Sequence, residues 1–334
     1  MMTSTHHHQR GLSIIELMVA ITLSMILTLG VFQIFSSSKQ TSRVQDGLAR
    51  LQENARFALD VLAHDIRMAG QLGCNGNANT FYSASLANHG APVFGYEQSA
   101  NPAIQLLAGN NLATPANWQT VSSTDAIVII SATPNNIPIT AVGAGQIQVA
   151  AAGLITDIDE GDPVLISDCE NADLTIAGAR AGNALTLATN YNYSPGAELA
   201  RINYIAYRVL LDTNSGYRNL HRAFVNAQTG VVSVDQEPLL EGVENFQLFY
   251  GEENNDGTIK YVTAAGVTNW QNVSSVRVHL LLSTLEDSLA TEAQRYWYVQ
   301  DGVDNMELKP VAGDRRLYRS FTTTIQLRNQ GIGI

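Results

Sequence analysis

A long apolar run near the N-terminus constrains this chain more than any other feature. Residues 12–35 read LSIIELMVAITLSMILTLGVFQIF, with one charged side chain, Glu16, and no proline. At 1.5 Å of rise per residue, the run makes a helix of about 36 Å, which crosses a hydrocarbon core of about 30 Å with some tilt. The sequence therefore predicts one membrane-spanning helix over residues 12–35.

The residues after this span predict that it stays on the mature protein. A secretory signal peptide has a shorter apolar region and closes with a small-residue cleavage site. Here the span is followed by Ser36, Ser37, Ser38 and Lys39 and then by more helical periodicity. We therefore expect a retained anchor.

Residues 36–70 continue the helix in amphipathic form. From Val44 to Ala69 the apolar positions recur every three or four residues, which is the spacing of one helix face. Gly70 and Gly73 supply stop signals. The pattern predicts a single helix from about residue 12 to about residue 70, whose second half lies across a globular domain.

Residues 71–334 change to short apolar runs separated by turn residues, and we predict a β-rich globular domain there. The expected strands are 126–131, 137–141, 146–151, 163–167, 184–188, 202–211, 246–251, 258–262, 273–283 and 317–327. Short, regularly spaced strands predict antiparallel sheet. Residues 71–120, rich in Asn, Ala, Gly and Ser, are expected to form loops and a small subdomain. The predicted fold class is α+β, a long N-terminal helix packed on an antiparallel sheet.

Charge and cysteine content limit the function. The net charge is −11, and no lysine or arginine occurs between Arg67 and Arg180. Such a surface repels a phosphate backbone, so we expect no nucleic-acid partner. The two cysteines, Cys74 and Cys169, exclude a cysteine-rich metal site. The pair indicates one disulfide in an extracytoplasmic protein and two unrelated thiols in a cytosolic one.

A search for catalytic motifs predicts no enzyme and no cofactor. The sequence lacks H-E-x-x-H, G-x-S-x-G, Walker and G-x-G-x-x-G motifs. Residues 36–39 fit S-x-x-K, but without companion motifs, so chance explains the match. Four histidines outside the N-terminal leader are scattered and favour surface or packing roles: His64, His89, His221 and His279.

Two acidic stretches partly match the pattern of a calcium-binding loop. Glu252, Asn254 and Asp256 approximate the start of a calcium loop, but Thr263 stands where a bidentate glutamate is needed. The same segment, EENNDG, reads as a hairpin turn. Residues 157–162 are also acidic and precede a strand as a turn. Hairpin and turn are favoured over metal sites at both places.

The N-terminus resembles a prepilin leader. Residues 1–11 end in Gly11 directly before the span, and Glu16 is the fifth residue after that glycine. The resemblance implies that a prepilin peptidase cuts between Gly11 and Leu12 on the cytoplasmic side, and that the new amine of Leu12 is methylated. Leu12 departs from the phenylalanine most common there. The leader carries away His6, His7 and His8.

This resemblance explains the acid in the span. A lone carboxylate in lipid costs several kcal/mol and usually marks function. Cleavage creates a free amine on Leu12, one helical turn from Glu16. In an assembled bundle, Glu16 of one subunit can neutralise the amine of its neighbour. The alternative is a stray acid that snorkels to the interface.

Four later stretches resemble the PilW family of type IV minor pilins, namely 58–74, 160–173, 241–251 and 315–329. The resemblance implies a type IV pilin-like fold and a part in pilus assembly within a minor-pilin initiation or tip complex. Implied partners are other minor pilins, the major pilin, the inner-membrane assembly platform and a tip adhesin. Implied processes are cell adhesion and twitching motility.

The same resemblance implies a location. The chain sits in the inner membrane with one span and its domain in the periplasm, and enters the pilus at the cell surface. In that compartment a Cys74–Cys169 disulfide is favoured, and it stabilises by about 4–5 kcal/mol before strain is subtracted. Two alternatives stay open: a minor pseudopilin of type II secretion, and a membrane-anchored enzyme or extracytoplasmic binding module.

Overall fold

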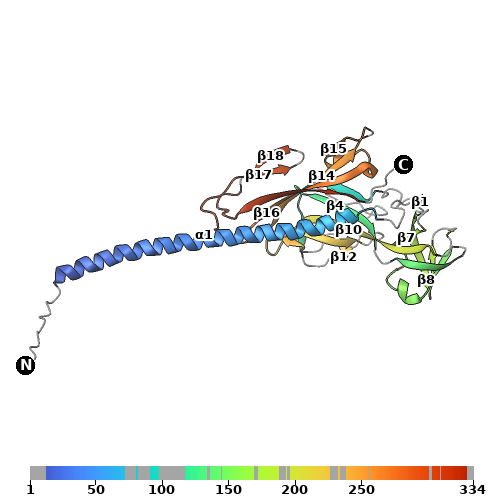
Figure 1. Cartoon of the computed structure of the whole chain (residues 1–334), viewed down its shortest axis with the longest axis horizontal. Helices are drawn as coiled ribbons and strands as arrows, with labels where there is room; N and C mark the ends of the chain where they lie inside the picture. The colour runs from blue at the N-terminus through green and yellow to red at the C-terminus, as the bar shows by residue number, and fades with distance from the viewer. Residues whose placement is uncertain are drawn as a thin grey trace, which may run out of the picture.

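A computed structural model gives the fold of the chain (Figure 1). It describes residues 13–71, 80–81, 91–97, 117–133, 136–143, 145–168, 172–187, 193, 196–225, 232–233, 238–254, 256–300, 303–308 and 310–328. One long helix leaves a β-rich domain as a rod, and the N-terminal end of the helix lies farthest from the domain (Figure 1).

The elements follow one another in this order: α1 (Ile14–Met68), β1 (Thr80–Phe81), β2 (Val93–Glu97), β3 (Trp118–Thr120), β4 (Asp125–Ala132), β5 (Ile137–Gly143), β6 (Gln146–Val149), η2 (Ala152–Ile155), β7 (Pro163–Ser167), β8 (Ala172–Ala181), β9 (Ala184–Leu187), β10 (Glu198–Asp212), β11 (Arg218–Val225), β12 (Val232–Ser233), β13 (Leu240–Glu241), β14 (Val243–Glu253), β15 (Ile259–Val262), η3 (Ala264–Gly266), η4 (Trp270–Asn272), β16 (Val273–Ser283), β17 (Tyr296–Gln300), β18 (Val303–Leu308) and β19 (Tyr318–Gln326). The η elements are short 3₁₀ helices.

Helix α1 runs without a break through the apolar run and the amphipathic stretch. It has 55 residues, which at 1.5 Å each span about 82 Å. It begins after the N-cap Ser13 and ends just before Gly70, whose φ of 70° stops the helix where a side chain would be strained. The predicted helix over residues 12–70 is confirmed within two residues at either end.

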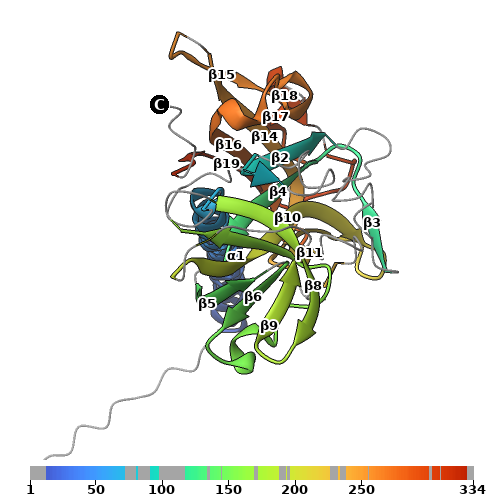
Figure 2. The ribbon, with the colours of Figure 1, turned by 90° about the vertical axis from the view of Figure 1, so that its right-hand side faces the viewer.

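The second half of α1 is buried in the largest hydrophobic core. Its inward positions recur every three or four residues: Leu51, Ala55, Ala58, Leu62 and Ile66. They pack on the inner face of a sheet with strand order β15-β14-β16-β19 and on β4 and β10. In the end-on view, α1 lies between the strands β14–β19 and the strands β5–β9 (Figure 2).

Strand β10 connects the parts of the domain. Its first residues pair with β5 and β7, and its later residues pair with β4 on one side and β11 on the other. Side chains alternate along it, so that Ile205 and Tyr207 face α1 while Tyr204 and Ala206 enter a second core. A third core lies among β5–β9 at the end remote from the rod (Figure 1).

The α+β prediction is confirmed, and its ten expected strands all form. Pairing is antiparallel throughout the described strands except for β1 with β8, which is parallel. Beyond residue 120, six strands were not expected: β8, β11, the two-residue strands β12 and β13, and the hairpin of β17 and β18. Within residues 71–120, expected to hold loops, the described part contains β1, β2 and β3.

Candidate functional site

The first half of α1 exposes its apolar side chains on every side. From Ile14 to Phe35 the large hydrophobic residues keep between 51% (Val19) and 77% (Ile14) of their surface exposed. Among the described residues, α1 is the one helix long and apolar enough to cross a membrane. Apolar surface on this scale is stable only in lipid or against other apolar helices.

Glu16 lies at the N-terminus of this exposed half, and its carboxylate accepts a hydrogen bond within its own chain. Its Oε2 accepts a hydrogen bond of 3.0 Å from the backbone N–H of Ser13, while Ser13 Oγ accepts one of 3.3 Å from the N–H of Ile15. This reciprocal pair is a capping box, and it places the carboxylate at the positive end of the helix dipole. Gly11 and Leu12, the predicted cleavage and methylation residues, lie outside the described residues.

The role of Ser13 was missed at the sequence level, although its signal was present. Ser13 and Glu16 form the pattern S-x-x-E directly before the apolar run, which is the sequence signature of a capping box. The carboxylate therefore has a structural task inside its own chain. One oxygen serves that task, and a carboxylate offers about four acceptor positions in all.

A buried polar triad fastens the other end of α1 to the sheet. Asp65 is 6% exposed and accepts hydrogen bonds from Tyr207 Oη at 2.5 Å and from Arg222 Nε at 2.7 Å. Burial, and then the negative charge of Asp65, raises the pKa of Tyr207 above its usual range, so the phenol stays protonated. The triad ties one face of the helix to β10 and β11 and so fixes its rotation about its own axis.

A second attachment lies where the exposed half of α1 meets the domain. We call residues 284–317, between β16 and β19, the strap. Gln40 Nε2 donates a 2.7 Å hydrogen bond to the carbonyl oxygen of Leu289, and Arg43 pairs with Glu286 at 3.7 Å. A side-chain Cβ placed at Gly47 would stand 3.0 Å from Leu289 Cδ1, so glycine permits this close approach.

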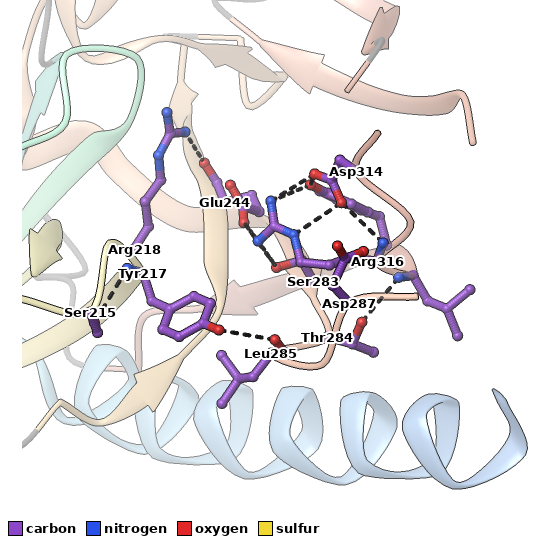
Figure 3. A network of polar contacts seen from close by, with 12 residues as sticks. Ser215, Tyr217, Arg218, Glu244, Ser283, Thr284, Leu285, Asp287, Asp314 and Arg316 are labelled. Atoms are coloured by element: carbon purple, nitrogen blue, oxygen red, sulfur yellow. Dashed lines mark hydrogen bonds and ion pairs between the residues drawn. The ribbon is translucent and has the colours of Figure 1, made fainter. Parts of the chain in front are cut away.

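The foot of the strap is held by the polar network in Figure 3. Arg316 donates to Glu244 Oε1 at 2.7 Å, to Asp314 Oδ2 at 2.9 Å and to Ser283 Oγ at 3.1 Å. Burial alone would raise the pKa of Asp314, but hydrogen bonds from Arg316 and Tyr318 outweigh it and lower that pKa to about 2. The network joins the ends of β14, β16 and β19 beside α1.

The acidic stretches serve the fold. Glu252 accepts hydrogen bonds from the hydroxyl of Thr268 at 2.5 Å and from the N–H of Asn269 at 2.7 Å. Asp256 lies in the β14–β15 hairpin and accepts from Thr258, as the hairpin interpretation predicts. In the second stretch, Asp162 accepts from the N–H of Asp159. Within the described ranges, no group of three His, Cys, Asp or Glu side chains could hold a metal ion.

The remaining predicted residues divide between described and undescribed parts of the chain. Cys74 and Cys169 both fall outside the described residues, so their disulfide stays a prediction. His89 also falls outside them. His221 is buried beside Trp118, and burial followed by the charge of Arg208 lowers its pKa to about 4. His279 Nδ1 lies 2.9 Å from Thr322 Oγ1.

Comparisons with known proteins match the two ends of this architecture. The family model described as Type IV Pilus-assembly protein W matches residues 207–329, a range that starts within β10 and includes all of β19. The Prokaryotic N-terminal methylation motif matches residues 6–32, across the leader and the exposed half of α1. None of the curated proteins compared matches significantly. Among solved structures, the chain is similar to the Type IV-like pilin TTHA1219 from Thermus thermophilus, with 12% identity, a TM-score of 0.35, and coverage of 84% of this chain and 98% of that one.

Proposed function

We propose that this chain, a type IV pilin-like protein of the PilW family, acts as a minor pilin in pilus assembly. In this role it belongs to a complex that initiates the filament or forms its tip. The family matches bear out the predicted resemblance. The position of the chain in such a complex is our inference from its shape and surface.

One observation carries the proposal. A single 55-residue helix is buried along its second half in its own domain, while its first half is apolar, exposed and matched by the methylation motif. A helix of this kind has two stable environments, a bilayer before assembly and a bundle of similar helices after it. Transfer between the two leaves the domain unchanged, as a filament subunit requires.

In the proposed mechanism, the prepilin peptidase removes residues 1–11 and creates an α-amine on Leu12, which is then methylated. Glu16 keeps its hydrogen bond from the Ser13 N–H through Oε2. Its other carboxylate oxygen accepts a hydrogen bond from the charged α-amine of a neighbouring subunit. An unpaired charge in lipid is costly, and the pair removes this cost in both chains. The pairing therefore favours the assembled state over the separate subunits.

The proposed partners follow from this cycle. They are the other minor pilins, the major pilin, the prepilin peptidase, the inner-membrane assembly platform and a tip adhesin. The span holds the chain in the inner membrane with its domain in the periplasm until the filament carries it to the cell surface. A minor pseudopilin of type II secretion would share all these features except the filament, so preparations of surface filaments separate the two.

An enzyme or a simple anchored binding module is the alternative of a different class. A plain anchor does not need a processed N-terminus, so processing discriminates. We expect peptide mass spectrometry of membrane-extracted protein to find N-methylated Leu12 as the first residue. A Gly11→Val variant, which removes the cleavage residue and keeps the span, should retain Met1. An intact Met1 in the wild type, or a cut near Ser36, would contradict the proposal.

A further inference from the structure

A groove opens between α1 and the foot of the strap. Its volume is about 320 Å³. The lining residues that matter here come from both walls: Gly47, Arg50, Leu51 and Asn54 from α1, and Leu285 and Leu289 from the strap. Figure 3 shows Thr284 and Leu285 on the side of the strap that faces α1.

The groove is a built feature with both walls fixed. The strap is tied to α1 by the bonds of Gln40 and Arg43, and its foot is held by the Arg316 network. Gly47 carries no side chain, so Leu289 of the strap packs directly against the helix there and fixes the two walls at close distance. A partner can therefore bind here without rearranging the chain, which lowers the entropic cost of association.

The chemistry of the groove is that of a protein interface. Its floor is apolar through Leu51 and Leu289, and Leu285 remains 40% exposed. Phe57 is 55% exposed and follows Arg50 by two helical turns, so it extends the apolar surface along the same side of α1. An apolar centre with a charged rim is the usual anatomy of protein–protein contacts.

The rim carries charges of both signs, which argues against a lipid headgroup as the occupant. Asp46 and Glu241 lie on the rim together with Arg50. Arg43 is paired with Glu286, whereas Arg50 makes no ion pair or hydrogen bond with any described residue. An acidic side chain from a protein partner would satisfy the guanidinium of Arg50, while the carboxylates would repel an anionic bilayer.

The position of the groove indicates which partner reaches it. Arg43 follows Phe35 by about 12 Å along the helix axis, so the groove continues directly from the exposed apolar half of α1. A chain whose helix packs along that half extends into the groove. This continuity favours a second pilin-type subunit over a soluble protein.

We propose that this groove docks a neighbouring pilin-type subunit through an apolar side chain flanked by an acid that pairs with Arg50. The proposal rests on the proposed function, and it adds a periplasmic contact that sets which subunit follows this one. The apolar span supplies affinity for any similar helix, and the groove supplies the choice of partner.

Photo-crosslinking in the full-length, membrane-inserted chain tests the contact. A photoreactive residue at Asn54 lies in the groove, and one at Gln52 lies about 200° around the same helix and serves as the matched control. We expect the Asn54 position to capture a protein that mass spectrometry identifies as pilin-type by its methylated N-terminus. The Gln52 position should capture it at least about fivefold less. Capture of phospholipid alone at Asn54, or equal capture at both positions, would overturn the proposal.

Charge variants test the role of Arg50. Arg50→Glu should lower the Asn54 crosslink at least about fivefold, and Arg50→Lys should retain most of it. Arg56→Glu makes the same change in charge on the same helix, outside the groove and beside Asp60, and should leave the crosslink unchanged. Normal crosslinking and normal filament incorporation in Arg50→Glu would refute the groove while leaving the minor-pilin role intact. Absence of the wild-type chain from filaments would refute the role itself.

Discussion

At Glu16, one carboxylate lies where the first turn of α1 needs an acceptor and where a methylated amine on Leu12 would need an anion. Its bond to Ser13 shows that the acid is accommodated within the isolated chain. The two tasks can be separated experimentally, because capping requires only an acceptor atom while pairing requires a negative charge.

Glu16→Gln should therefore keep the helix terminus and abolish assembly. The amide oxygen still accepts from Ser13, so membrane insertion and cleavage after Gly11 should match the wild type. Co-isolation with partner pilins should fall strongly, because a partner's amine would be left unpaired in a low-dielectric bundle. Ser13→Ala removes the other half of the capping box and is the matched control. If Glu16→Gln supported piliation at the wild-type level, charge pairing would not be the role of this acid.

Asp65 gives a stability prediction at the same scale. Asp65→Ala should lower the free energy of unfolding by about 3 kcal/mol, because it leaves the buried Tyr207 and the partly buried Arg222 without their shared acceptor. The measurement is thermal or denaturant unfolding of the detergent-solubilised chain. Asp60→Ala removes the exposed partner of Arg56 and should change stability by less than about 1 kcal/mol. Equal effects of the two substitutions would contradict the anchoring role of the triad.

At the scale of elements, α1 is one helix whose two halves lie in different surroundings. A Leu→Ala substitution should therefore destabilise the domain in the buried half and leave its stability unchanged in the exposed half. Leu62 is 1% exposed in the core, and Leu62→Ala should lower the free energy of unfolding by about 2–5 kcal/mol through lost burial and a cavity. Leu23 is 56% exposed, and Leu23→Ala should leave unfolding of the domain unchanged. A large effect at Leu23 on domain unfolding would contradict this division.

The predicted disulfide would join the segment after α1 to the segment after β7. Cys74 follows the helix end at Met68 by six residues, and Cys169 follows β7 by two. We expect a non-reducing peptide map of the exported protein to contain the linked pair, and Cys74→Ser to lower the melting temperature. Cys169→Ser should give the same shift, because either change opens the same bond. Two free thiols after export would refute the prediction.

Secondary structure could be read from the sequence where local pattern and environment agree. The helix followed from its period, and β16 matched residues 273–283 because alternating apolar residues face one core. Strand β8 was missed because four of its ten residues, in ADLTIAGARA, are alanine and another is glycine, which gives the segment a low intrinsic preference for strand. Its pairing with β7 and β9 makes it a strand despite that low preference. Strand β11 was missed because it buries Asn219 and His221.

The residues of the candidate site could likewise be predicted only where a local sequence pattern marks them. Glu16 stood out as a lone acid in an apolar run, and Ser13 was readable from spacing alone. The hydrogen bond between Asp65 and Tyr207 joins residues 142 positions apart, so no local sequence pattern predicts it. The groove beside Gly47 depends likewise on how the strap folds back onto α1, which is a tertiary property.

At the scale of the whole molecule, the chain joins an exposed apolar helix to an acidic β-rich domain. The exposed half of α1 offers apolar surface that similar helices share, whereas residues 71–334, the β-rich domain, carry 25 of the 30 Asp and Glu residues. The net charge of the whole chain is −11, and an acidic surface favours solubility. On this account, the helix admits the chain to an assembly and the domain determines its place there.

The most direct test of the central claim is the composition of sheared surface filaments. Quantitative mass spectrometry should find this chain in purified filaments, cleaved at Leu12 and far less abundant than the major pilin. A strain that lacks the chain should carry few or no filaments, and re-expression of the wild type should restore them. Absence of the chain from filaments, together with normal piliation in the deletion strain, would contradict the account.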